Sequence, residues 1–180
     1  MASTSSSVTT TSLPALRAYF TGDAAFREGR FEESYEAFTR ATEADSLFAL
    51  AHYRRSMAAE WTTRLDVAIT AAEAALRHSA RLSERDRRQL EAFLAYRRGA
   101  FHAAERLYRT IVGRYPDDVE AWNHLGETLF HYGPLHGRSL QASRDAFERV
   151  LSYDTFRGAA LIHLARVAAA AGRRGGLDSL

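Results

Sequence analysis

The sequence predicts an all-α protein, built as a solenoid of antiparallel helix pairs. Three observations support this fold class: a small residue that recurs at a nearly constant interval, apolar residues that keep the same phase, and glycines that recur where one helix would end. The chain has 180 residues, of which 46% are hydrophobic and 26% charged. This is enough to bury a core of the size found in one ordinary domain.

The recurring small residues set the repeat length. Gly22, Ser56, Ala92, Gly126 and Ala165 follow one another at intervals of 34, 36, 34 and 39 residues, and each lies in an apolar pattern of helical spacing. A period of roughly 20–50 residues is the signature of an architecture in which each structural unit packs on the next.

Three further positions keep this phase. After each of the first four small residues, a second small residue follows at 12 positions, an aromatic residue or alanine at 16, and an apolar residue at 19, with five extra residues in the fourth repeat. Antiparallel helices approach closely only where small residues face each other, and an aromatic ring then fills the space beside them. The three sets are Ser34, Ala68, Ala104 and Ser143; Phe38, Ala72, Tyr108 and Phe147; and Ala41, Ala75, Ile111 and Val150.

Turns and helix starts are marked as well. A glycine recurs seven positions after the first small residue, where the chain must turn; these glycines are Gly29, Gly99, Gly133 and Gly172. Ser12 and Ser83 are typical residues to cap the start of a helix. These signals predict nine helices, near 13–28, 31–45, 48–61, 65–79, 83–98, 100–114, 118–132, 139–153 and 156–171.

The segment 131–139 departs from the regular pattern, because it adds five residues to the turn inside the fourth repeat. Insertions in repeat arrays lie in loops, often beside a binding face. The alternative is a longer turn that only spaces the two helices.

The residues of the fourth repeat resemble the tetratricopeptide repeat family. Trp122, Leu125, Gly126 and Leu129 carry the resemblance, and Tyr-Pro-Asp-Asp at 115–118 precedes them. The first repeat matches through Gly22, Phe38 and Ala41. The resemblance implies a right-handed superhelical solenoid of about four and a half such repeats.

The resemblance also sets the expected boundaries. Residues 13–174 form the array, 1–12 a flexible Ser/Thr-rich tail or linker, and 175–180 an incomplete final helix or tail. The predicted last helix is apolar on much of its surface, so we expect either a longer array, with further repeats or a catalytic module elsewhere, or a partner that covers this end. Residues 10–19 resemble the segment before the repeat region of bacterial regulators such as serine/threonine kinases.

Composition and motifs exclude several chemistries. The chain has no cysteine, and all 24 of its basic residues are arginine, so thiol and lysine catalysis and cysteine-ligated zinc are excluded. It contains no phosphate-binding glycine loop and no His-Glu-x-x-His signature. We therefore predict that it is not an enzyme and needs no cofactor. No segment is apolar enough for a membrane span, and we expect a cytoplasmic location or, alternatively, the periplasmic part of a membrane-anchored regulator.

Seven histidines raise the question of a metal site. His124, His131 and His136 lie close in sequence, but on one helix the first two are separated by two turns, which is too far for one ion. We expect ordinary surface or loop histidines and no metal.

Arginines are frequent between Arg77 and Arg98. Glu84 and Arg88 are four residues apart and can pair on a helix, so a solvated and partly neutralised face is expected. A patch for an acidic partner or for nucleic acid is the alternative. Proteins on which nucleic-acid bases stack have aromatic residues between their basic residues, and this segment does not show that pattern. Nucleic acid is therefore not expected as a partner.

In the family, the first helix of each pair lines the concave side, which implies a groove for a protein or peptide ligand. Several of the aromatic candidates could instead pack between neighbouring repeats. We also expect acidic groove residues to repel a terminal carboxylate. The candidates are Tyr19, Asp23, Phe26, Tyr53, Met57, Glu60, Gln89, Phe93, Tyr96, Asn123, Glu127, Phe130 and Arg166.

The function predicted from these observations is a scaffold that binds proteins or peptides, as part of a larger bacterial protein. The alternative is the non-catalytic sensory or assembly region of a serine/threonine kinase, a cyclase or a transcriptional regulator. Because the fold does not identify the ligand, the choice between these two functions depends on the residues of the binding site.

Overall fold

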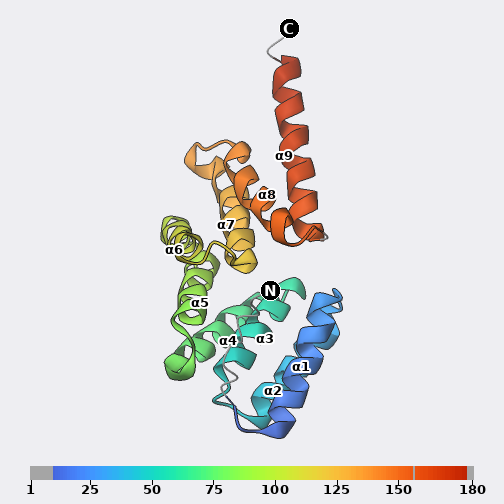
Figure 1. The fold of residues 1–180 in the computed structure, drawn as a ribbon, viewed down its shortest axis with the longest axis vertical. Helices are drawn as coiled ribbons and strands as arrows, with labels where there is room; N and C mark the ends of the chain where they lie inside the picture. The colour runs from blue at the N-terminus through green and yellow to red at the C-terminus, as the bar shows by residue number, and fades with distance from the viewer. Residues whose placement is uncertain (1–9, 156, 178–180) are drawn as a thin grey trace. The chain divides into compact units, whose positions relative to one another are not determined.

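The computed structural model describes residues 10–155 and 157–177 and confirms the all-α fold (Figure 1). No β-strand is present in these two ranges, and no helix in them is long and apolar enough to cross a membrane. Their nine α-helices are α1 Leu13–Arg27, α2 Phe31–Ala44, α3 Ala49–Trp61, α4 Leu65–Arg77, α5 Glu84–Arg97, α6 Phe101–Arg114, α7 Val119–Tyr132, α8 Arg144–Tyr153 and α9 Gly158–Leu177.

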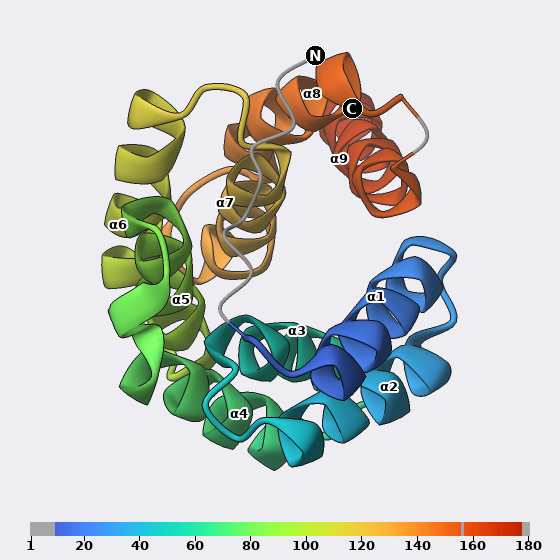
Figure 2. The same ribbon diagram turned by 60° about the horizontal axis from the view of Figure 1, so that its bottom comes forward.

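The chain divides into a first unit, residues 1–98, and a second unit, residues 99–180. In the first unit α1 packs on α2, α2 on α3, α3 on α4 and α4 on α5. Figure 2 shows α1 lying beside α2 and α3 beside α4. The connections inside these two pairs span only three residues, 28–30 and 62–64, so the paired helices run antiparallel.

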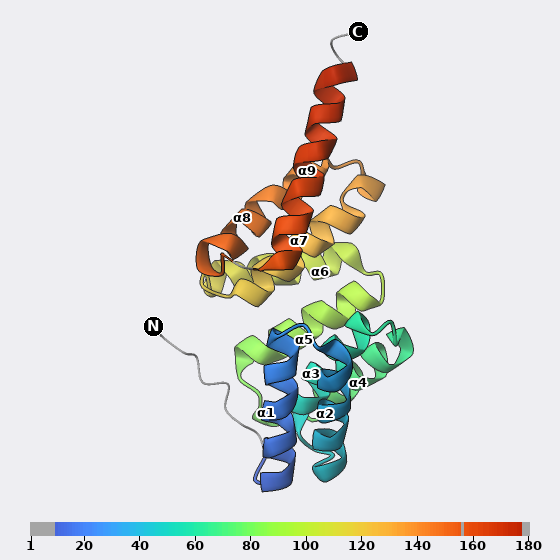
Figure 3. The ribbon, with the colours of Figure 1, turned by 90° about the vertical axis from the view of Figure 1, so that its right-hand side faces the viewer.

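In the second unit α6 packs on α7, α7 on α8 and α8 on α9. The last of these helices is the longest and extends well past α8 (Figure 3). Leu161 and Ile162 are exposed on it, in agreement with the apolar surface expected for this helix.

The predicted contact between a small residue and an aromatic ring is found in both units. A Cβ atom placed on Gly22 would lie 2.9 Å from the ring of Phe38, and one placed on Gly126 would lie 2.6 Å from the ring of Phe147. Both rings are fully buried. In the first pair the Ser34 hydroxyl also donates a hydrogen bond of 2.9 Å to the carbonyl oxygen of Gly22. Small residues at these points therefore set how closely the paired helices approach.

The predicted helix caps are also present. The Ser12 hydroxyl accepts a hydrogen bond from the amide of Ala15 at 3.3 Å, and the Ser83 hydroxyl accepts one from the amide of Asp86 at 3.1 Å. Each bond satisfies an amide that the helix itself leaves without a partner.

The glycine turns were predicted correctly in two repeats. Gly29 and Gly99 both have a φ of +75°, which ends α1 and α5. In the second repeat the same place is taken by Thr63, with a φ of +62°. The hydrogen bonds around Thr63 are the same as those around Gly29. The amide of the following residue, Arg64, donates to the carbonyl oxygen of Ala59 at 2.8 Å. The turn is thus imposed by helix packing, even where the residue is not glycine.

Gly133 also follows the end of its helix, α7, but with a different backbone conformation, and Gly172 does not end a helix. Gly133 has a φ of −52° and leads into a short 3-10 segment, so the left-handed residue of this turn is Gly137, with a φ of +73°. The five inserted residues move the turn along the chain. Gly172 lies inside α9, because a glycine costs a helix only about 1 kcal/mol and does not end it unaided. That helix crosses the expected boundary between residues 174 and 175, whereas residues 1–9 and 178–180 lie outside the described part.

The inserted loop is tied to α6 through Glu105. This carboxylate accepts hydrogen bonds from Arg138 of the loop and from Arg109, the latter at 3.0 Å. Burial by itself would raise the pKa of Glu105, but the two arginines outweigh it and lower that pKa. The loop is therefore fixed to α6 by an ion pair, in addition to spacing the two helices that it connects.

Candidate functional site

The predicted groove residues lie on α1, α3, α5, α7 and α9, but they differ in accessibility. Five have buried side chains: Tyr19, Tyr53, Met57, Gln89 and Phe93. The ring of Tyr19 lies 5.6 Å from Phe38, and the ring of Tyr53 lies 6.1 Å from Phe93. Tyr19, Tyr53 and Phe93 therefore pack inside the first unit.

The other eight predicted residues retain exposed area. Arg166 is exposed, and the remaining seven are half-buried: Asp23, Phe26, Glu60, Tyr96, Asn123, Glu127 and Phe130. Of the predicted groove residues, only these eight retain surface that a ligand could contact.

The acidic groove residues of the first unit are paired with arginines, which bears on whether they would repel a carboxylate. Asp23 of α1 lies 3.5 Å from Arg27 on the same helix and 3.7 Å from Arg54 of α3. Glu60 of α3 lies 2.7 Å from Arg97 of α5. Each of these carboxylates is thus neutralised by an arginine from the next first helix, a partner that spacing along one helix did not predict.

The second unit holds a similar group around Glu127. Its two carboxylate oxygens lie 3.2 Å from Nε2 of His131, on the same helix, and 3.4 Å from Nδ1 of His163, on α9. Sequence reasoning rejected a metal site on the basis of His124, His131 and His136, and did not consider His163, which comes from another helix.

The two groups occupy equivalent places in the repeat. Asp23 and Glu127 each follow the small residue of their repeat by one position, and Arg27 and His131 follow it by five. We name Asp23, Arg27 and Arg54 the arginine triad, and Glu127, His131 and His163 the histidine triad.

The third members match too. Arg54 precedes Ser56 by two positions, and His163 precedes Ala165 by two. The repeat phase was therefore the signal in the sequence that would have connected His163 with Glu127.

An aromatic cluster on the first unit was not predicted. Phe31, the first residue of α2, stacks on Trp61, the last residue of α3, with ring centroids 4.7 Å apart and an angle of 8° between the planes. Phe26 of α1 meets Phe31 edge-on at 5.3 Å. Trp61 is 53% exposed. The end of one helix, the start of the next and the end of a third thus form one apolar surface, which we name the Trp61 cluster.

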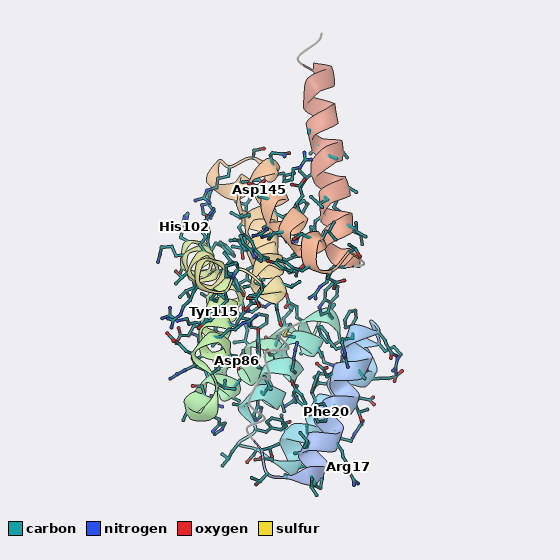
Figure 4. All side chains as sticks on the ribbon, in the orientation of Figure 1. Arg17, Phe20, Asp86, His102, Tyr115 and Asp145 are labelled. Atoms are coloured by element: carbon teal, nitrogen blue, oxygen red, sulfur yellow. The ribbon has the colours of Figure 1, made fainter. Side chains whose placement is uncertain are left out.

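Further apolar residues are exposed on this unit. Phe20 lies one turn from Arg17 on α1 (Figure 4) and is exposed, as are Leu47 and Leu65. Of these, Leu65 begins the helix that follows the Trp61 turn. Single exposed apolar side chains are common, whereas a stacked aromatic group is less so.

One solved structure of low sequence identity shares the fold, and two others align over most of the chain. MamA of MSR-1 is 15% identical and aligns over 88% of this chain and 87% of its own, with a TM-score of 0.51. YrrB, a tetratricopeptide repeat protein with an unusual peptide-binding site, is 19% identical over 89% of this chain and 79% of its own, with a TM-score of 0.47. The first such domain of Spaghetti, bound to an HSP90 peptide, is 16% identical over 89% and 95%, with a TM-score of 0.38.

Sequence comparison gives the family. No curated protein is significantly similar to the chain. The sequence pattern of the tetratricopeptide repeat, however, matches residues 21–83 and 90–133, which is more than half of the chain. The matched ranges include the small residues Gly22, Ser56, Ala92 and Gly126, which set the repeat. The chain therefore belongs to the tetratricopeptide repeat family.

Proposed function

We propose that this chain is a scaffold that binds a protein or peptide segment without catalysing a reaction. The observation that carries the proposal is the match to the repeat family over more than half of the chain. Helix repeats present an extended surface that suits the capture of a partner chain. In a larger regulatory protein, such a domain would serve as the assembly or sensory arm.

We place the main contact surface at the Trp61 cluster. Tryptophan is enriched among the residues that dominate binding energy, because a large ring buries much area and has few rotamers to lose. Trp61 is held by its stack on Phe31, so it is partly ordered before binding. Glu60, one of the predicted groove residues, precedes it and is paired with Arg97.

The chemistry of this surface favours a particular ligand. An apolar or aromatic side chain of the ligand would cover the exposed part of Trp61, and polar groups of the ligand would meet the Glu60–Arg97 pair. The pair combines a guanidinium, which donates hydrogen bonds, with a carboxylate, which accepts them, and it carries no net charge. We therefore expect a peptide with one apolar anchor and no requirement for a high charge.

A peptide display library selected against the whole chain tests this function. We expect selected peptides to share an apolar anchor, and their Kd to be measurable by fluorescence polarisation. Changing Trp61→Ala should weaken binding at least about 30-fold, which corresponds to the loss of about 2 kcal/mol at a dominant contact.

The matched control is Leu135→Ala, since Leu135 is 75% exposed and lies in the loop of the second unit. Circular dichroism should show both variants as helical as the wild type. Failure to select any peptide would contradict the binding function. Equal Kd values for wild type, Trp61→Ala and Leu135→Ala would contradict the location.

A further inference from the structure

The histidine triad joins two helices of the second unit. Glu127 and His131 are four residues apart, so both point from one face of α7, and His163 reaches them from α9. One donor atom from each of the three residues lies within 4.8 Å of the other two. All three side chains carry atoms that can ligate a metal ion.

The spacing of the donors fits a transition metal. Zinc binds imidazole nitrogen and carboxylate oxygen at about 2.0–2.2 Å, so neighbouring donors in a tetrahedral site are about 3.3 Å apart. The Oε2 atom of Glu127 lies 3.2 Å from the His131 nitrogen, and the Oε1 atom of the same carboxylate lies 3.4 Å from the His163 nitrogen. The three donors lie within 4.8 Å of one another, so a side-chain rotation is needed to bring all of them to this spacing, and His131, whose side chain is 44% exposed, has room for it.

His163 is held in position before any ion binds. Its ring stacks on Phe147 at 4.8 Å with an angle of 13°, and Phe130 meets it edge-on at 4.6 Å. Its side chain is 11% exposed. Two aromatic rings thus fix the direction in which the Nδ1 atom points, and a preorganised ligand loses little freedom on binding.

The arginine triad of the first unit provides an internal comparison. There the same three repeat positions hold Asp23, Arg27 and Arg54, and the two arginines approach the carboxylate at 3.5 and 3.7 Å. A guanidinium stays protonated and has no lone pair to offer, so this triad serves only as an ion pair. In the histidine triad both cationic positions carry imidazoles, which retain the pairing with the carboxylate and add the capacity to ligate a metal.

The site is open on one side. His131 is largely exposed, whereas Glu127 and His163 lie deeper. Three protein donors leave one position of a tetrahedral ion vacant, as in sites where water or an external group completes the coordination.

We propose that Glu127, His131 and His163 bind one divalent transition-metal ion of the zinc class, with its fourth position free for water or for a donor from a bound partner. Two imidazoles and one carboxylate favour Zn²⁺, Co²⁺ or Ni²⁺ over Mg²⁺ and Ca²⁺, which prefer sites made only of oxygen atoms. The ion would tie α9 to α7. This inference does not depend on the peptide-binding proposal.

Isothermal titration of the full chain, first stripped with a chelator, tests the proposal. We expect Zn²⁺ to bind one per chain at high affinity and to raise the Tm, and Mg²⁺ to do neither. Titration with Co²⁺ should produce the visible absorption of a tetrahedral ion. A Tm and a titration that Zn²⁺ leaves unchanged would overturn the proposal.

Variants locate the ion. His131→Arg reproduces Arg27 of the arginine triad, so it retains a partner for Glu127 and removes one ligand. We expect it to remain folded and to bind Zn²⁺ at least about 10-fold more weakly, since the loss of even an outer-shell partner of a metal ion costs about 10- to 100-fold in affinity. Glu127→Gln should weaken binding as well.

The control is His136→Gln. The ring of His136 lies 4.6 Å from that of His102 on α6, which is the other close histidine pair of this unit in the described residues. Zinc affinity should be unchanged in this variant. If His136→Gln lost the ion and His131→Arg kept it, the metal would belong to the His102 pair and the proposed triad would be wrong.

Discussion

The ring of Phe147 occupies the space that a side chain at Gly126 would need. A Cβ atom at residue 126 would lie 2.6 Å from the nearest ring atom and within 2.8 Å of two others. Both residues are buried, and the ring belongs to α8 whereas the glycine belongs to α7. The close approach of these two helices thus depends on the absence of one methyl group.

Gly126→Ala is therefore expected to destabilise the second unit by about 1–3 kcal/mol, the usual cost of overpacking a core. The added methyl group must displace a fully buried aromatic ring or separate α7 from α8. Urea unfolding followed by circular dichroism measures the change.

Gly113→Ala is the matched control for that substitution. Gly113 lies in α6 and is exposed, and a Cβ atom there would meet nothing within 4 Å. Because alanine is the better helix former, stability should rise by up to about 1 kcal/mol. Equal effects of the two substitutions would contradict the steric explanation.

Thr63→Gly should stabilise the first unit. The left-handed conformation costs a residue with a side chain about 1–2 kcal/mol, and glycine removes this strain. Against this, glycine destabilises the folded state by about 0.5–1 kcal/mol, because the unfolded chain gains conformational entropy. A net gain of roughly 0.5–1 kcal/mol remains. Differential scanning calorimetry should show a higher Tm.

The reverse change tests the same point at Gly29, which has a φ of +75° in the preceding repeat. Gly29→Thr should lower the Tm, since it introduces the strain that Thr63 already carries. A Tm that rises or stays constant in Gly29→Thr would show that the turn relaxes away from the left-handed conformation.

Glu105→Gln should loosen the inserted loop in a way that depends on pH. The lowered pKa of Glu105 means that its charged form is favoured in the folded protein. Its contribution is therefore present above the unfolded value of about 4.3 and is lost as the pH falls through the lowered folded value. We expect about 1 kcal/mol at neutral pH, measured as the difference in unfolding free energy between wild type and variant. A difference that does not shrink with acid would contradict the ion-pair explanation.

His52 should make stability fall as the pH falls below the usual imidazole range. Burial lowers the pKa of His52, although its hydrogen bond of 2.9 Å with the carbonyl oxygen of Ser46 acts in the opposite direction. The unfolded chain then takes up a proton first, at about pH 6.5, and stability is lost progressively until the folded pKa is reached. Thermal unfolding between about pH 8 and pH 5 should show a shallower pH dependence in His52→Gln than in the wild type. Identical slopes would contradict this assignment.

The helix pairs followed from the sequence because their signals are local. The small residues Gly22 and Gly126, the rings of Phe38 and Phe147, and the serine caps all act within one repeat, so spacing along the chain was enough to place them. The turns at Gly29 and Gly99 were also predicted by local signals, although Thr63 shows that the backbone at this place follows packing and not residue type.

The site depended on contacts between helices that are distant in sequence. Periodicity indicated which residues share a face with Tyr53 or Glu127, but not that Phe93 would cover the former or that His163 would reach the latter. The same three repeat positions hold a carboxylate and two arginines in one unit, and a carboxylate and two histidines in the other, and the spacing that relates them is present in the sequence. Only the packing of α9 against its unit decided that those three positions meet, because distances between helices are set by the side chains that fill the space between them.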